Sequence, residues 1–183
     1  MCGRGIGRAP LLAWRLGLGT LLGHRFVLIT TRGRRSGLLH RAVLEYGALR
    51  GKLYVISGFG SQAEWHKDLS ADPYVMVQTW QGPEPMQAHC VTDDAEIRDI
   101  CALFMQWNPR FFRRHLLSLP AGSDSIEEVM AHKERLAILR FDPTDEVVPP
   151  PLKVDLVWVW PLLAAVLGSL AWAMRRRCKC DED

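Results

Sequence analysis

The sequence lacks several patterns that mark common functional classes. None of its five cysteines belongs to a Cys-x-x-Cys pair, and no Gly-x-x-x-x-Gly-Lys-Ser/Thr motif occurs. These absences argue against a disulfide framework, a structural zinc site and a P-loop nucleotide site, and they favour a reducing compartment. His66 and His89 lack the spacing of metal ligands, so we predict no metal site.

A strong charge of either sign is also missing. Lys and Arg outnumber Asp and Glu by only 23 to 20. Many of the arginines are clustered instead, at residues 175–177 and within the first 41 residues, as Arg4, Arg8, Arg15, Arg25, Arg32, Arg34, Arg35 and Arg41. Nucleic-acid binding needs a broader basic surface than these two patches, so no nucleic-acid partner is predicted.

One long uncharged run stands near the C-terminus. Residues 156–174 contain 19 residues without a charge, which would span roughly 28 Å as a helix. Tryptophans lie near both ends and "RRRCK" follows, so the run predicts a transmembrane helix over residues 156–174. Residues 147–155 then form a Pro-rich linker and residues 175–183 a basic and acidic tail. A buried helix or a strand-rich tail is the competing interpretation.

The N-terminal segment differs from an export signal, because Arg15 and several glycines interrupt its apolar run and no small-residue cleavage site follows. We therefore predict a single-pass C-terminal anchor with the domain in the cytoplasm, although the basic tail by itself favours the opposite orientation. Residues 1–24 predict an amphipathic helix whose apolar stripe covers a core or lies on a membrane surface. The stripe consists of Leu11, Leu12, Trp14, Leu18, Leu21 and Leu22.

The middle of the chain is rich in short apolar, β-branched runs. Six of them predict strands: "RFVLITT", "RAVLEY", "KLYVIS", "PYVMVQTW", "MQAHCVT" and "RLAILRF". The segments "GALRG" and "QGPEP" have the length and composition of hairpin loops. Residues 61–71, with Ser61 as the expected cap, and residues 93–107 predict helices. The fold class is therefore α+β, with a mostly antiparallel sheet that closes into a barrel with flanking helices.

The stretch "TTRGRRSGLLHRAVLEY" predicts an anion site. Gly33 and Gly37 permit a tight turn, and Ser36 offers a hydroxyl and exposed amides. Arg34, Arg35 and Arg41 add planar guanidinium groups that suit phosphate oxygens. A solvated loop or a surface for lipid head groups is the alternative.

A second loop, "SGFGS", connects a strand with the helix that carries Trp65. Glycines at a strand end allow backbone amides to approach a flat ligand closely, and the helix start adds partial positive charge. An ordinary strand-to-helix turn explains the composition equally well.

Four motifs together carry a family resemblance. In this order and spacing, "GHRFVLITTRGRRSG", "HRAVLEY", "YVISGFG" and "EWHKDLSADP" resemble the deazaflavin-dependent nitroreductase family, whose members are split β-barrel proteins that bind coenzyme F420. The resemblance covers about Leu16 to Pro143 and implies a split-barrel deazaflavin-binding domain over residues 25–146. Relatives often carry Asn where Asp68 stands.

The resemblance implies a set of coenzyme contacts. The arginine turn, helped by the next strand, would hold the phosphate and the acidic tail, and the glycine loop and the following helix would line and close over the ring. The implied residues are Arg34, Arg35, Ser36, His40, Arg41, Ala42, Val43, Leu44, Ile56, Ser57, Gly58, Phe59, Gly60, Glu64, Trp65 and Asp68. FMN is the alternative cofactor, because barrels of this type also bind it.

The implied activity is hydride transfer from reduced F420 to a quinone, an enone or a nitroaromatic compound. With a membrane anchor, a lipid-soluble quinone is the first expectation, and membrane lipid becomes a partner. A proton would come from water or from Tyr46, Ser57 or His66. The different functional class is a membrane-tethered carrier that binds F420, FMN or a lipophilic ligand without turnover, and a homodimer is left open.

Overall fold

The computed structural model describes the backbone of residues 8–58, 60–107 and 125–179. The chain divides into two compact units. Residues 20–151 form one unit, and residues 1–19 together with residues 152–183 form the other.

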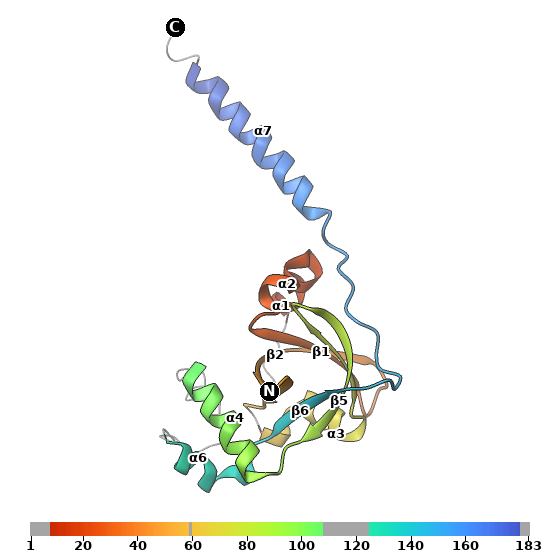
Figure 1. The fold of residues 1–183 in the computed structure, drawn as a ribbon. Coiled ribbons are helices and arrows are strands. Elements are labelled where there is room, and N and C mark those ends of the chain that lie inside the picture. The colour runs from red at the N-terminus through yellow and green to blue at the C-terminus, as the bar shows by residue number, and fades with distance from the viewer. Residues whose placement is uncertain (1–7, 59, 108–124, 180–183) are drawn as a thin grey trace. The chain divides into compact units, whose positions relative to one another are not determined.

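The larger unit is built around a closed six-stranded barrel (Figure 1). Around the barrel the strands follow the order β1, β2, β3, β6, β5, β4, and every neighbouring pair is antiparallel. The strands are β1 Phe26–Arg32, β2 Leu39–Leu49, β3 Lys52–Ile56, β4 Tyr74–Thr79, β5 Gly82–Cys90 and β6 Ile138–Pro143. The predicted antiparallel barrel of six strands with flanking helices is confirmed.

Two of the hairpins are tighter than the sequence predicts. Residues of "GALRG" and "QGPEP" continue the strands, which leaves two-residue connections between β2 and β3 and between β4 and β5. Arg50 and Gly51 both have positive φ, 52° and 77°, as a two-residue type I′ turn requires.

Alternate side chains of the strands fill the barrel. The buried interior consists of Val27, Ile29, Tyr46, Val55, Leu69, Val75, Val77, Met86, Ala88, Leu139 and Phe141. Spacing by two along each strand places these residues on the inner face. Leu69 comes from a helix that packs on β1 and β2, α3 Glu64–Ala71.

A second cluster lies outside the barrel, under two helices. α4 Asp94–Trp107 and α6 Ile126–Ala131 pack side by side (Figure 1), and their apolar faces meet Tyr54 of β3 and Ile138 of β6. α6 begins with a capping box between Ser125 and Glu128. The helix over residues 94–107 follows the predicted one closely, whereas α6 was not predicted.

The start of α3 differs from the expectation. A short 3-10 turn, Gly60–Gln62, precedes the helix, and Ala63 is its N-cap without a side-chain hydrogen bond. The prediction of Ser61 as the cap is therefore wrong, because this serine lies inside the 3-10 turn.

The smaller unit joins segments from both ends of the chain. Its N-terminal part runs through α1 Arg8–Ala13, a π-helical turn Trp14–Leu18 and the start of α2 Gly19–Leu22. Gly17 has φ of 86° and interrupts the helix. Arg15 donates two hydrogen bonds to Asp155, at 2.8 and 2.6 Å, and Trp160 donates from Nε1 to the carbonyl oxygen of Leu16 at 2.8 Å.

The predicted transmembrane helix is wrong. Among the residues that the structure describes, no helix is long and apolar enough to cross a membrane. α7 runs over Val159–Lys179, so the uncharged helix extends only from Val159 to Met174 before Arg175 follows. Those 16 residues measure about 24 Å, short of a hydrocarbon core of about 30 Å. The predicted single-pass C-terminal anchor and its membrane localisation are wrong for the same reason.

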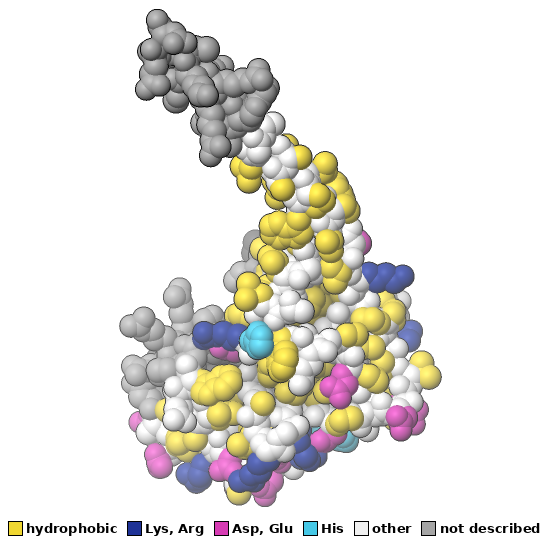
Figure 2. Space-filling view, turned by 45° about the horizontal axis from the view of Figure 1, so that its top comes forward, with side chains coloured by type: hydrophobic (Ala, Val, Ile, Leu, Met, Phe, Trp, Pro, Cys, Tyr) yellow, Lys and Arg dark blue, Asp and Glu magenta, His cyan; other side chains and the backbone are white. Residues whose placement is uncertain are grey.

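Apolar side chains are nevertheless exposed along α7. Leu162, Leu163, Val166 and Leu167 are each about half exposed or more, and Figure 2 shows hydrophobic side chains over the described part of this helix. On the same view, charged side chains of both signs are scattered over the barrel.

Candidate functional site

The antiparallel topology brings the two predicted loops to one end of the barrel. β1 and β3 both run antiparallel to β2, so both strands lead toward the end of the barrel at which β2 begins. Arg32 of β1 pairs with Leu39 at the start of β2, whereas Val55 of β3 pairs with Tyr46, farther along β2. The turn of residues 33–38 and the segment of residues 57–63 leave the barrel there. α3 follows the second segment and packs against β1 and β2. We call this region the site end of the barrel.

The arginine turn is closed by its own backbone. The amide of Gly33 donates to the carbonyl oxygen of Leu38, and the amide of Gly37 donates to that of Gly33, both at 2.8 Å. Gly37 has φ of 67°, which favours glycine. A Cβ atom on Gly33 would lie 2.7 Å from Cε1 of His40, so the imidazole ring packs directly on the turn.

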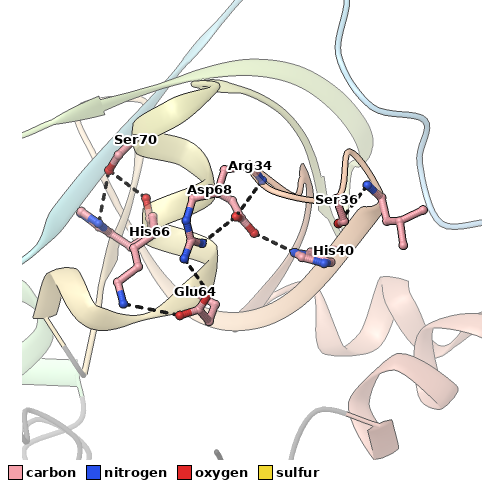
Figure 3. A network of polar contacts seen from close by, with 9 residues as sticks. Arg34, Ser36, His40, Glu64, His66, Asp68 and Ser70 are labelled. Carbon is pink, nitrogen blue, oxygen red and sulfur yellow. Dashed lines mark hydrogen bonds and ion pairs between the residues drawn. The ribbon is translucent and has the colours of Figure 1, made fainter.

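The carboxylate of Asp68 ties this turn to α3 (Figure 3). Asp68 is 1% exposed. Its Oδ1 accepts from the amide of Arg34 at 3.1 Å and from the Arg34 guanidinium at 2.9 Å. Its Oδ2 lies 2.7 Å from Nδ1 of His40, and because an ionised carboxylate only accepts, the ring nitrogen donates. Both ends of the turn are thus held by one buried side chain.

A second carboxylate completes the network. Glu64, at the start of α3, accepts from the Arg34 guanidinium at 3.0 Å and lies 3.4 Å from Nζ of Lys67. The hydrogen bond from Arg34 lowers the pKa of the Glu64 carboxyl. The Arg34 guanidinium, hydrogen-bonded to Glu64 and to Asp68, has a raised pKa. Both outer nitrogens of Arg34 are therefore bound to carboxylates.

Opposing effects set the pKa of Asp68. Burial raises the pKa, whereas the hydrogen bonds from His40 and from the amide and side chain of Arg34 lower it. The net pKa lies below the ordinary value for aspartate. The carboxylate is therefore ionised at neutral pH in spite of its burial.

Arg35 and Arg41 differ from Arg34 in their surroundings. Both are exposed, and within the described parts of the chain neither guanidinium has an ion pair or a hydrogen bond. The two side chains are the cations at the site end that are left for an outside anion. Ser36 lies exposed beside them, and its Oγ accepts from the amide of Leu38 at 3.3 Å.

The glycine loop contributes a buried hydroxyl. Ser57 is 2% exposed, its amide donates to the carbonyl oxygen of Ala137 at 2.9 Å, and its Oγ has no partner among the described residues. Gly60 has φ of 57° and donates to the carbonyl oxygen of Ser57 at 3.0 Å. Gly58 is not among the glycines with positive φ, and Phe59 lies outside the described residues.

Apolar residues of the predicted site lie at the edge of the barrel core. Ala42, Leu44 and Trp65 are partly buried and pack against the interior cluster. The alternation of β2 places Val43 on the opposite face of the strand. Ile56, at the end of β3, packs instead against the outer cluster under α4 and α6.

The three candidate proton donors lie in different surroundings. Tyr46 stands six residues along β2 from His40, about 20 Å away, and its hydroxyl donates to the carbonyl oxygen of Gly23 at 2.9 Å. Burial raises the pKa of Tyr46 and lowers that of His66. Nε2 of His66 is buried without a partner among the described residues. Ser57 alone of the three belongs to the glycine loop at the site end.

Sequence reasoning missed the central role of Asp68 in this geometry. His40 and Asp68 are 28 residues apart, and no local pattern links them. The departure from the usual Asn at this position was the available signal, since an additional buried negative charge requires partners. Among the described residues, no cluster of His, Cys, Asp and Glu is arranged to hold a metal ion.

Comparison with known proteins decides the family. The profile described as F420H(2)-dependent quinone reductase matches residues 15–114, which is more than half of the chain. The chain belongs to this family. The family resemblance seen in the sequence motifs is thereby confirmed, and the chain is an F420H2-dependent reductase whose cofactor is coenzyme F420.

Solved structures show weaker likenesses. An F420-H2 dependent reductase is 19% identical, with 64% of this chain and 94% of that chain covered and a TM-score of 0.47. A putative pyridoxamine 5'-phosphate oxidase from Listeria innocua is 15% identical, with 70% and 90% covered and a TM-score of 0.47. A conserved hypothetical protein from Mycobacterium tuberculosis is 13% identical, with 75% and 89% covered and a TM-score of 0.46. No curated protein matches the chain.

Proposed function

We propose that this F420H2-dependent reductase acts on a quinone-type acceptor and that the site end of the barrel holds the coenzyme. The family supports the acceptor class. The observation that carries the location is the pair of exposed arginines, Arg35 and Arg41, which stand without a partner among the described residues beside a buried network of polar contacts.

The chemistry of the donor set fits the coenzyme. F420 carries a phosphate and a tail of carboxylates, and guanidinium groups bind both kinds of anion through paired hydrogen bonds. Arg35 and Arg41 would hold the tail, with Ser36 adding a hydroxyl from the same turn. Arg34 and His40, both bound to Asp68 at the base of the turn, would add positive charge and hydrogen-bond donors near the tail.

Two buried hydroxyls also fit a polar-edged ring. The alternation of β1 places Thr31 on the inner face with Val27 and Ile29. Oγ1 of Thr31 and Oγ of Ser57 are both buried without a partner in the described chain. Thr31 lies near the end of β1, and Ser57 directly follows β3. Buried hydroxyls are normally hydrogen-bonded, so these two atoms are donors that a bound ring could use.

The bound coenzyme supplies a hydride, and the chain supplies position and shielding. Ala42 and Leu44 would border the ring from β2, and the loop from Ser57 to Gly60 would lie along its edge. Trp65 packs against the barrel core and, with the rest of α3, would exclude water. The Ser57 hydroxyl is the donor we propose for a proton to the acceptor oxygen, with water as the proton source that restores it.

The test is anaerobic oxidation of F420H2 by the purified protein with a benzoquinone, an enone or a nitroaromatic compound as the acceptor. We expect the absorbance of oxidised deazaflavin to return fastest with the quinone. Arg35→Gln should raise KM for F420H2 with little change in kcat. Faster turnover of the enone or nitro compound would contradict the quinone assignment, and tight coenzyme binding with no acceptor reduced would indicate a carrier.

A further inference from the structure

Two adjacent arginines of the same turn have opposite surroundings. Arg34 is bound by Asp68 at 2.9 Å and by Glu64 at 3.0 Å (Figure 3), whereas Arg35 has no partner among the described residues. From residue type alone, Arg34 and Arg35 are predicted to be equivalent phosphate ligands. The structure separates them, because one positive charge is already balanced within the protein and the other is not.

We propose that Asp68 is a positioning residue, which holds Arg34 and His40 so that the turn presents Arg35 and Arg41 to the phosphate and carboxylates of the coenzyme. This inference rests on the proposed function. Arg34 then helps to hold the turn in its conformation, and Arg35 and Arg41 make the direct electrostatic contacts with the coenzyme tail.

The contacts of Asp68 explain why Arg34 stays with it. Both carboxylate oxygens are in use, and the group is 1% exposed. An incoming phosphate that withdrew Arg34 would leave a buried carboxylate without its cation, which is strongly unfavourable. An exposed, unpaired guanidinium has no such partner to lose. The coenzyme tail is therefore expected to bind Arg35 and Arg41 at a lower cost.

The same contacts explain how Asp68 fixes the turn. Arg34 opens the turn of residues 33–38, and His40 follows it on β2. Oδ1 binds the first and Oδ2 the second, so the carboxylate bridges the two sides of the hairpin from α3. Close packing of the His40 ring on Gly33 leaves the turn little freedom to shift.

The direction in which Asp68→Asn changes the affinity for F420 tests the proposal. If Asp68 positions the turn, the variant should bind F420 about ten- to a hundredfold more weakly, since charge-assisted contacts are lost. If Asp68 instead competes with the coenzyme for Arg34, removing its charge should tighten binding, and that result overturns the proposal. A deazaflavin without phosphate or glutamates should bind wild type and variant equally, because it does not contact the turn.

Salt dependence separates the two arginines. Arg35→Gln should flatten the dependence of F420 affinity on ionic strength, because an exposed charge that contacts the tail is screened by salt. The double variant Arg34→Gln with Asp68→Asn removes one charge of each sign, so it should weaken binding yet leave the slope of wild type. A slope flattened as much as in Arg35→Gln would show that Arg34 contacts the tail directly, contrary to the proposal. This comparison also serves if Asp68→Asn alone fails to fold.

Hydrogen exchange in the coenzyme-free protein gives a readout independent of F420. Asp68→Asn should increase exchange in residues 33–41 and 64–71 together. The matched control is Asp72→Asn, at the end of the same helix, where the carboxylate lies 3.8 Å from Arg32, and it should leave residues 33–41 unchanged. Unchanged exchange in Asp68→Asn overturns the positioning role. If wild type binds no F420 while Asp68→Asn still increases exchange relative to wild type, the proposed function fails, and the positioning role toward the coenzyme falls with it.

Discussion

At the scale of single residues, the proposed site contains buried polar atoms of two kinds, those with partners and those without. Asp68 has partners for both oxygens, while the hydroxyls of Thr31 and Ser57 have none in the described chain. A satisfied buried carboxylate is explained by the fold itself. An unsatisfied buried hydroxyl is not, and a bound ligand is one way to supply its partner.

Ser57→Ala is expected to separate catalysis from stability. Because the Ser57 hydroxyl lacks a partner, its removal should leave the free energy of unfolding unchanged or raise it by about 1 kcal/mol. The turnover rate with a quinone should fall, by roughly ten- to a hundredfold if the hydroxyl transfers the proton. Thermal unfolding without ligand and kcat measure the two effects. A destabilised variant would mean that Oγ has a partner, and an unchanged kcat would remove Ser57 from the chemistry.

The acid limit of stability is expected to depend on Asp68. Its pKa is lowered in the folded protein, and in the unfolded chain the group titrates near about pH 3.9. The contribution of the carboxylate to stability is therefore complete above that pH and is lost as the pH falls through the lower folded pKa. Asp68→Asn should be less stable at neutral pH and lose less further stability toward acid. Urea midpoints at about pH 7 and about pH 3 measure this difference. An equal acid loss in both proteins would show that other carboxyls dominate.

At the scale of elements, the barrel depends on a close approach of β2 and α4. A Cβ atom on Gly47 would lie 2.9 Å from Cε2 of Phe104 and 3.0 Å from Cδ2 of Leu103. Glycine at this strand position therefore lets the helix pack directly on the sheet. Gly51, with nothing within 4 Å of its Cβ position, is needed for its positive φ instead.

Gly47→Ala is expected to destabilise the protein by overpacking. A methyl group at this distance must displace the Phe104 ring, at a cost of about 1 to 3 kcal/mol. Phe104→Leu shortens the opposing side chain, so the double variant should lose less than the sum of the two single losses. Chemical denaturation of the four proteins measures the coupling. Strict additivity would show that the strand and the helix adjust independently.

A strand or helix is predicted correctly where its own local pattern of apolar and polar residues is enough to determine its structure. β1, β3 and β6 follow β-branched runs. β5 begins at Gly82, earlier than predicted. The prediction placed a turn there because Pro83 and Pro85 are typical of turns. In the structure, residues 82–85 pair in register with β4 only, and proline is tolerated in a strand where a ladder hydrogen bond is not required.

Other features depend on contacts or boundaries that a local pattern does not contain. The apolar run over residues 156–174 predicted a helix that begins at Leu156, whereas α7 begins at Val159, which shortens its uncharged part. The arginine turn was predicted as an anion site from its composition, but the division between Arg34 and Arg35 depends on Asp68, which lies 34 residues from Arg34. Long-range partners of this kind are set by the topology of the barrel.

At the scale of the whole molecule, the proposed site and both apolar clusters belong to one compact unit. The barrel interior, the cluster under α4 and α6, and the turn with Arg35 and Arg41 all lie within residues 20–151. The other unit has its own contacts, among them the bidentate pair of Arg15 and Asp155. A unit that contains its own core can fold alone.

A fragment of residues 20–151 is therefore expected to fold and to bind F420 with an affinity within about threefold of the full chain, a difference below about 1 kcal/mol. The reason is that every residue proposed to contact the coenzyme, from Thr31 to Trp65, is retained, as is Asp68. Circular dichroism, thermal unfolding and coenzyme titration of the fragment measure this, with Arg35→Gln in the fragment as the control for tail binding. A folded fragment that binds F420 much more weakly would show that the unit joining the two chain ends contributes to the site, and an aggregated fragment would show that it covers part of the barrel.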